Sequence, residues 1–316
     1  MLQDLVAHET AGDPMSDQKW VRSSLSQLSG RLGEKGYPLS PSTVSRLLKK
    51  LGYSLHANVK TAEAGREHPD RDQQFKYIEA QRQVFQAAGW PMISVDSKKK
   101  ELIGNFKNAG RTWGQEPESV NTHDFLHDAL GRAVPYGIYE LIHNGGYVYV
   151  GCSGDTPQFA VQVLAAWWHT EGSIAFPQAN QLLILADAGG SNGCRPRVWK
   201  RELQTQLSDP CGLTLTVCHY PTGCSKWNPI EHRLFGPISL NWAGKPLRTF
   251  DIMLACIRGT TTATGLTVKA FLMEGVYENG QHVSDAEMKA LNIEHHTVCP
   301  NWNYTIRPRQ SATLGH

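Results

Sequence analysis

The chain has 316 residues, of which 40% are hydrophobic and 19% charged, a composition typical of a folded protein with room for two domains. It contains no run of about 18 apolar residues, so we expect no membrane span. The seven cysteines form no Cys-x-x-Cys pair, which favours free thiols in a reducing cytoplasm over a disulfide framework. The net charge of +2 by itself says nothing about nucleic-acid binding.

The basic residues gather near the N-terminus, where residues 17–60 carry eight Lys and Arg against two acidic residues. Ser40 and Pro41 are typical of the first positions of a helix, and Gly52 is typical of its end. Apolar residues at positions i, i+3, i+4 and i+7 predict that one side of this helix is buried: Val44, Leu47, Leu48 and Leu51. An earlier amphipathic stretch, residues 20–32, predicts a second helix before a tight turn.

Two helices joined by a tight turn, the second basic and rich in hydroxyls, indicate a helix-turn-helix DNA-binding domain over residues 17–60, after a tail of residues 1–16. The alternative is a helical hairpin whose charges are only solvated. We expect DNA contacts from the polar surface of the second helix: Ser42, Thr43, Arg46, Lys49 and Lys50. A connecting helix within residues 61–90 is predicted to lead into the next domain.

From residue 91 onward apolar strands alternate with helices, which predicts an α/β fold. The strand "ISVD" ends at Asp96, the strand "LLILAD" ends at Asp187, and Glu231 lies near the start of a helix in "WNPIEHRLF". Each acid has an ordinary explanation. The two aspartates could belong to turns, and Glu231 could complete a capping box with Asn228.

Taken together, the three acids predict a metal site. Side chains at the carboxyl ends of strands in an α/β sheet meet at one edge, where ligands bind, so Asp96, Asp187 and Glu231 should converge. Neighbouring carboxylates raise one another's pKa, and a divalent cation removes that penalty. Two Mg²⁺ ions about 4 Å apart can activate a nucleophile and stabilise the leaving oxygen of a phosphodiester. We expect Mg²⁺, with Mn²⁺ as a substitute.

Several motifs resemble those of DDE transposases from bacterial insertion sequences. "KWNPIEHRLF" is similar to the Asn-Pro-x-Glu signature of the Tc/mariner-related members, and "ISVDSKKKELIGNFKNAGRTW" resembles the family named after the element ISAzo-thirteen. The resemblance runs from about residue 12 to the C-terminus. It implies a ribonuclease H-like catalytic domain over residues 91–245, with a mixed sheet flanked by helices, and a C-terminal extension over residues 246–316. It also implies that the three acids are the metal-binding catalytic triad.

The resemblance further implies a reaction and its partners. An activated water would hydrolyse the transposon end, and the freed 3′-hydroxyl would attack target DNA without a covalent protein–DNA intermediate. Double-stranded DNA is then the partner, a homodimer or larger assembly is expected on DNA, and the location is the bacterial cytoplasm at the nucleoid. Family members carry a further helix-turn-helix before the point where this chain starts, so we expect a truncated product or a misplaced start.

Basic residues beside Asp96 are expected to bind the phosphate backbone in salt-sensitive contacts that do not read sequence: Lys98, Lys99, Lys100, Lys107 and Arg111. A solvated turn is the alternative. Trp227 and Lys226 could reach a splayed base or a phosphate, although packing is the favoured role of Trp227.

Two other functions stay open. A catalytically inactive, transposase-derived DNA-binding protein would keep residues 17–60. A phosphatase-type enzyme would use Asp96 as its nucleophile, although such enzymes usually carry a second Asp where this chain has Lys98.

Overall fold

The computed structural model describes residues 2, 10–12, 19–21, 24–53, 69–112, 116, 118–121 and 128–309. The chain divides into two compact units, Met1–Glu63 and Ala64–His316. Most of the predicted N-terminal tail, the end of the predicted helix-turn-helix domain and the start of the connecting segment lie outside the described residues. No described helix combines the length and apolar character needed to cross a membrane. All seven cysteines are free, as predicted.

The first unit contains a pair of helices, α2 (Leu25–Glu34) and α3 (Pro41–Lys50). Ser40 caps α3 through the backbone N–H of Thr43, as the sequence predicts. The two helices pack through a small apolar core of Leu28, Leu32 and Val44. Two short antiparallel strands, β1 (Thr10–Gly12) and β2 (Lys19–Val21), complete the described part of this unit.

The predicted start of the first helix at residue 20 is wrong, because residues 19–21 form strand β2 and the helix begins at Leu25. A reciprocal capping box sets this start. The Ser24 hydroxyl accepts from the Gln27 N–H at 3.2 Å, and the Gln27 side chain accepts from the Ser24 N–H at 2.8 Å.

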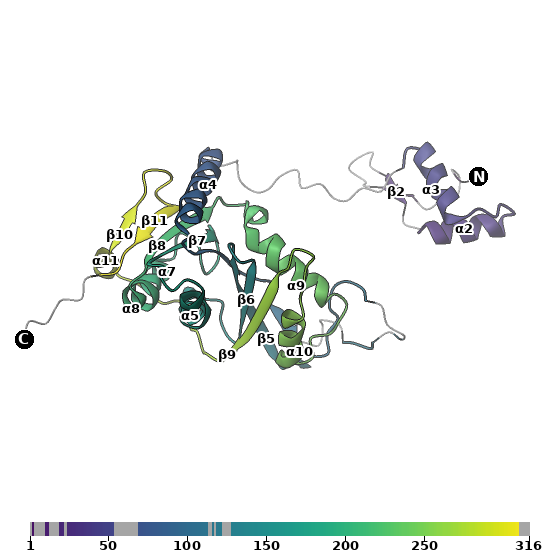
Figure 1. Cartoon of the computed structure of the whole chain (residues 1–316). Helices are drawn as coiled ribbons and strands as arrows, with labels where there is room; N and C mark the ends of the chain where they lie inside the picture. Colours follow the sequence, from purple (N-terminus) through teal and green to yellow (C-terminus); the bar gives the residue numbers. More distant parts are fainter. Residues whose placement is uncertain are drawn as a thin grey trace, which may run out of the picture. The chain divides into compact units, whose positions relative to one another are not determined.

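The second unit is built on a nine-stranded mixed sheet with the order β10-β11-β8-β7-β3-β5-β6-β9, in which β4 also pairs with β5 (Figure 1). The strands are β3 (Met92–Ser97), β4 (Glu101–Ile103), β5 (Gly131–Glu140), β6 (Gly145–Gly151), β7 (Gln181–Asp187), β8 (Thr214–Tyr220), β9 (Thr267–Met273), β10 (Ile293–His295) and β11 (Asn303–Ile306). Strands β3, β5 and β6 run antiparallel in succession, and β7 and β8 run parallel to β3. This succession confirms the predicted ribonuclease H-like fold with a mixed sheet.

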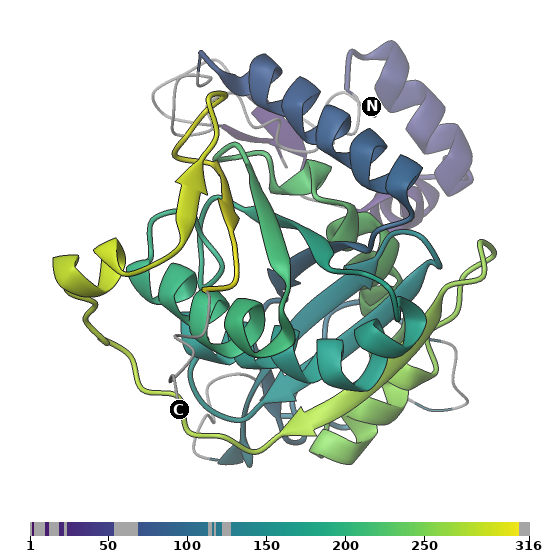
Figure 2. The ribbon, with the colours of Figure 1, turned by 60° about the vertical axis from the view of Figure 1, so that its left-hand side comes forward.

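Helices cover both faces of the sheet (Figures 1 and 2). On one face, α4 (Arg71–Ala88) packs Ile78 and Phe85 against apolar side chains of β3, β7 and β8. On the opposite face, α5 (Pro157–Trp167), α7 (Arg197–Glu202) and η3 (Leu203–Ser208) bury the largest core cluster. The other helical segments are η2 (Trp168–Gly172), α6 (Ser173–Ala175), α8 (Asp209–Cys211), η4 (Ser225–Trp227), η5 (Glu231–Phe235), α9 (Gly236–Asn241), α10 (Phe250–Arg258) and α11 (Asp285–Lys289).

The C-terminal segment completes both edges of this sheet. Strand β9 pairs in parallel with β6, and β11 pairs antiparallel with β8. Residues 246–316 therefore contribute strands to the same sheet that carries residues 91–245.

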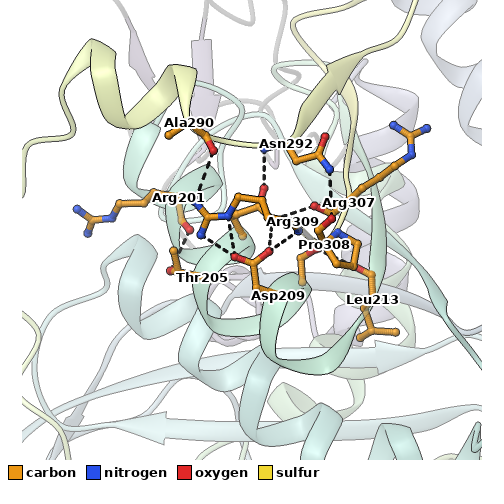
Figure 3. A network of polar contacts seen from close by, with 11 residues as sticks. Arg201, Thr205, Asp209, Leu213, Ala290, Asn292, Arg307, Pro308 and Arg309 are labelled. Carbon is orange, nitrogen blue, oxygen red and sulfur yellow. Dashed lines mark hydrogen bonds and ion pairs between the residues drawn. The ribbon is translucent and has the colours of Figure 1, made fainter. Parts of the chain in front are cut away.

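Beyond β11 the chain is fastened by the carboxylate of Asp209 (Figure 3). The Asp209 oxygens accept from the backbone N–H of Arg309 at 2.9 Å and from its guanidinium at 2.6 and 2.9 Å. The Gln204 amide donates to the same carboxylate at 2.6 Å. Burial alone would raise the Asp209 pKa, but these hydrogen bonds hold the pKa below its ordinary value.

Replacing Asp209 with Asn tests this contact. A carboxylate with a depressed pKa stabilises the fold above its ordinary pKa of 3.8, and the contribution disappears as the pH falls through the lower native value. Asp209→Asn should therefore lower the free energy of unfolding by about 1 kcal/mol at neutral pH. Urea denaturation over a pH series should show the two proteins converging in acid; a constant difference at every pH would contradict the assignment.

Candidate metal-dependent active site

Two carboxylates stand side by side at the carboxyl ends of adjacent parallel strands. The register of β3 with β7 pairs Val95 with Ala186, and Asp96 and Asp187 are the next residues on the two strands. Neighbouring strands lie about 4.8 Å apart, and residues in the same register project to the same face of a sheet. The sheet itself therefore places the first two predicted ligands together.

Asn228 ties the segment before Glu231 to both strands. Its amide Nδ2 donates to Asp187 Oδ1 at 2.9 Å and to the Val95 carbonyl at 3.4 Å. Its Oδ1 accepts from the hydroxyl of Ser94, which also accepts from the Ile230 N–H at 3.1 Å. Asn228 and Ser94 are completely buried, so this network fixes where the next helix begins. The alternative in which Asn228 and Glu231 form a capping box does not hold, because the Asn228 side chain contacts the strands rather than the helix end.

A glycine opposite Asp96 makes room for the helix that carries Glu231. Gly137 on β5 pairs with Asp96, and a Cβ atom there would lie 2.5 Å from Phe235 and 2.9 Å from Ile230. The missing side chain lets the helical segment from Pro229 onward approach the sheet closely. Glu231 is the first residue of η5, a π-helical turn, a feature that often occurs at functional sites.

Charges within the group of three acids affect their pKa values. Burial raises the pKa of Asp96 to about 8, and the charges of Asp187 and Glu231 add to this rise. Burial also raises the pKa of Asp187, against the hydrogen bond from Asn228. The Glu231 pKa is raised by burial and by Asp187, while His232 and Lys98 act in the opposite direction. The nearby positive charges therefore offset only part of the rise at Glu231.

The donor set fits a hard divalent cation. In the described part of the chain, no group of three or more His, Cys, Asp and Glu side chains is arranged to hold a metal ion. The structure thus brings Asp96 and Asp187 together, and Glu231 lies close enough to interact with them electrostatically. The three side chains as described are not arranged as one set of metal ligands. Carboxylate oxygens from one or two residues, with water in the remaining positions, are what Mg²⁺ requires. A bound cation would also favour the ionised form of these carboxyl groups and so lower their raised pKa values.

Among the predicted phosphate-binding residues, Lys98 differs from the others. Its side chain is 11% exposed, its ammonium lies 3.4 Å from Glu101 Oε1, and the same ammonium lies 4.6 Å from the ring centroid of Trp242. Burial lowers its pKa, although Glu101 and Glu231 favour the charged form. The remaining basic residues are exposed: Lys99, Lys100, Lys107 and Arg111. Lys98, Lys99 and Lys107 line a groove of about 280 Å³.

The predicted DNA-binding residues of α3 lie in the other unit. Arg46, Lys49 and Lys50 are exposed. The hydroxyls of Ser42 and Thr43 lie 2.8 and 3.0 Å from Ser40 Oγ, so both take part in the cap of the helix.

Sequence reasoning missed two contributors to the site. Asp155 accepts from the Ser97 hydroxyl at 2.8 Å and adds to the rise of the Asp96 pKa. Ser94 holds Asn228 in place. No pattern in the sequence singles out either residue for this site, whereas Asn228 belongs to the Asn-Pro-x-Glu motif. Trp227 packs edge-on against Phe75, but the residue stays 55% exposed.

A mixed sheet with aspartates at adjoining strand ends and a glutamate on a following helix is the arrangement that the sequence resemblance to DDE transposases implies. The chain belongs to the Rhodopirellula transposase DDE domain family, whose model matches residues 1–308. No curated protein matches the chain.

The chain is similar to solved structures of the Mos1 transposase. With its paired-end complex with the left transposon end, the identity is 13% and the TM-score 0.43, over 79% of this chain and 66% of that chain. With the Mos1 mariner paired-end complex with Mn, the identity is 13% and the TM-score 0.41, over 79% of this chain and 67% of that chain.

Adding one methyl group at residue 137 tests how the helix of Glu231 is seated. Gly137→Ala should force Phe235 and Ile230 away from the sheet and lower the free energy of unfolding by about 1–3 kcal/mol. It should also weaken Mn²⁺ binding measured by calorimetry, since Glu231 moves with the helix. Gly189→Ala, close to Asp187 but facing open space, is the matched control and should be nearly neutral. Equal effects of the two substitutions would contradict this role of Gly137.

Proposed function

We propose that the protein is a DNA transposase that catalyses metal-dependent phosphodiester hydrolysis and strand transfer at the ends of an insertion sequence. The observation that carries this proposal is that Asp96 and Asp187 directly follow a paired position on adjacent strands, while Asn228 joins the start of the Glu231 helix to both strands. Membership of a transposase DDE domain family supports it independently.

Asp96, Asp187 and Glu231 would hold Mg²⁺, with Mn²⁺ as a substitute. When bound, the ions would supply the positive charge that activates a water or 3′-hydroxyl and stabilises the leaving oxygen. Asn228 donates to Asp187 Oδ1 and so fixes the direction in which that carboxylate points. The ammonium of Lys98 favours the ionised form of Glu231, the form that binds a cation. The Asn228 contact thus orients Asp187 before DNA arrives.

DNA would be held by both units. The exposed Arg46, Lys49 and Lys50 on α3 suit a helix-turn-helix contact with duplex DNA, in which Ser42 and Thr43 would add polar contacts. Lys99, Lys100, Lys107 and Arg111 would bind phosphates beside the active site. Joining two transposon ends calls for at least two copies of the chain on DNA, so the proposed assembly is a homodimer or larger.

Substitution of Asp187 tests the proposed reaction. Asp187→Ala removes a ligand from the acid pair and should reduce Mg²⁺-dependent nicking of duplex DNA by about 100-fold or more. Duplex binding in a gel-shift assay should hardly change, because the substitution removes no positive charge. Asp251→Ala, an exposed acid on α10, is the control and should nick at the original rate.

The outcomes separate this proposal from an inactive DNA-binding protein. Undiminished nicking by Asp187→Ala would refute the assigned triad. Duplex binding without nicking by the unsubstituted chain, in either Mg²⁺ or Mn²⁺, would favour the inactive DNA-binding protein.

Salt dependence should distinguish Lys98 from its neighbours. Each phosphate contact adds about 0.9 to the slope of log affinity against log salt concentration. Lys99→Ala and Lys100→Ala should each reduce that slope, whereas Lys98→Ala should leave it unchanged because its ammonium is turned to Glu101 and Trp242. Lys289→Ala, an exposed lysine on α11, is the control. If Lys98→Ala and Lys99→Ala reduced the salt slope equally, Lys98 would also contact a phosphate, contrary to this prediction.

A further inference from the structure

An exposed aromatic ring lies next to the proposed active site. Trp227, in η4, is 55% exposed. Phe75 on α4 supports the ring edge-on, with centroids 5.9 Å apart and an interplanar angle of 71°. The ammonium of Lys226 lies 5.9 Å from the centroid of the same ring. The indole is thus held in place from the protein side while much of its surface stays open to solvent.

The backbone around Trp227 fixes the ring relative to the catalytic acids. The Trp227 N–H donates to the Cys224 carbonyl at 2.8 Å, and the Asn228 N–H donates to the Ser225 carbonyl at 2.8 Å. Asn228 in turn binds Asp187 through its side chain. Only one peptide bond therefore separates the exposed indole from a residue that touches a proposed metal ligand.

A positively charged cavity lies further along α4. Its volume is about 650 Å³, and it is lined by Arg82, Tyr139, Leu141, Pro229, His232 and Arg233. No carboxylate is among these lining residues, although Glu79 pairs with Arg82 at 2.8 Å. Phe75 and Arg82 are seven residues apart on α4, so they lie on the same side of the helix about 10.5 Å apart. The supported ring and the cavity thus share one side of α4.

We infer that Trp227 and this cavity form a binding site for an unpaired segment of the DNA strand beside the scissile phosphate. One base stacks on the indole, and a phosphate of the same strand lies between Arg82 and Arg233. Stacking requires a base with a free face, which a base inside an intact duplex does not offer, while an exposed aromatic ring beside positive charge suits single-stranded nucleic acid. The inference rests on the proposed function, because it takes DNA as the substrate.

A short oligothymidine with one 2-aminopurine tests the site without requiring cleavage. Stacking on an aromatic side chain contributes about 1–3 kcal/mol per base, so Trp227→Ala should weaken binding by about 5- to 150-fold. It should also relieve the quenching of 2-aminopurine fluorescence on binding. Trp227→Phe keeps a ring and should retain most of the affinity and the quenching. Val276→Ala removes another exposed hydrophobic side chain, 88% exposed, and should change neither.

Arg82→Ala and Arg233→Ala test the cavity separately. Each should weaken binding of the same oligothymidine and lower its salt slope by about 0.9, while the quenching in the remaining complex persists. Unchanged affinity and quenching in Trp227→Ala would overturn the inference, as would equal losses in Trp227→Ala and Val276→Ala. Because this assay needs no chemistry, absence of nicking by the unsubstituted chain would count against the proposed function and not against this site.

Discussion

The structure depends on two like charges held together at the end of a buried sheet. Asp96 and Asp187 occupy the same register on adjacent parallel strands, and burial with mutual repulsion raises the pKa of Asp96 to about 8. The strands that carry them place their apolar side chains in two core clusters, so the acids cannot move apart without disturbing the core. The fold therefore holds two carboxyl groups at the ends of β3 and β7, where a bound cation would be stabilised.

The surrounding residues serve to bring a third acid to that place. Gly137 leaves space for the Glu231 helix, and the buried Asn228–Ser94 pair joins the start of that helix to both strands. Lys98, itself held by Glu101 and Trp242, offsets part of the charge near Glu231. The polar contacts and the close packing thus hold the same short segment, residues 228–235, against the sheet.

Much of this arrangement could be predicted from the sequence, for physical reasons that differ between elements. Continuous apolar strands ending in aspartate are strong local signals, and so is the Ser40–Pro41 start of α3. The sequence leaves the role of Asn228 open, because Asn before Pro also suits a helix cap, and only the tertiary fold decides which partner its side chain meets. The burial of Lys98 could not be predicted, because Trp242 is distant in sequence. The wrong start of the first helix has a local cause, the Ser24–Gln27 capping box.

Anomalous diffraction from crystals of the protein soaked in Mn²⁺ would show directly whether Asp96 and Asp187 hold a metal ion. We expect anomalous density between the carboxylates of Asp96 and Asp187, with Glu231 turned in to complete the coordination. Mn²⁺ bound only elsewhere, or no density near these carboxylates at a concentration that supports nicking, would contradict this expectation.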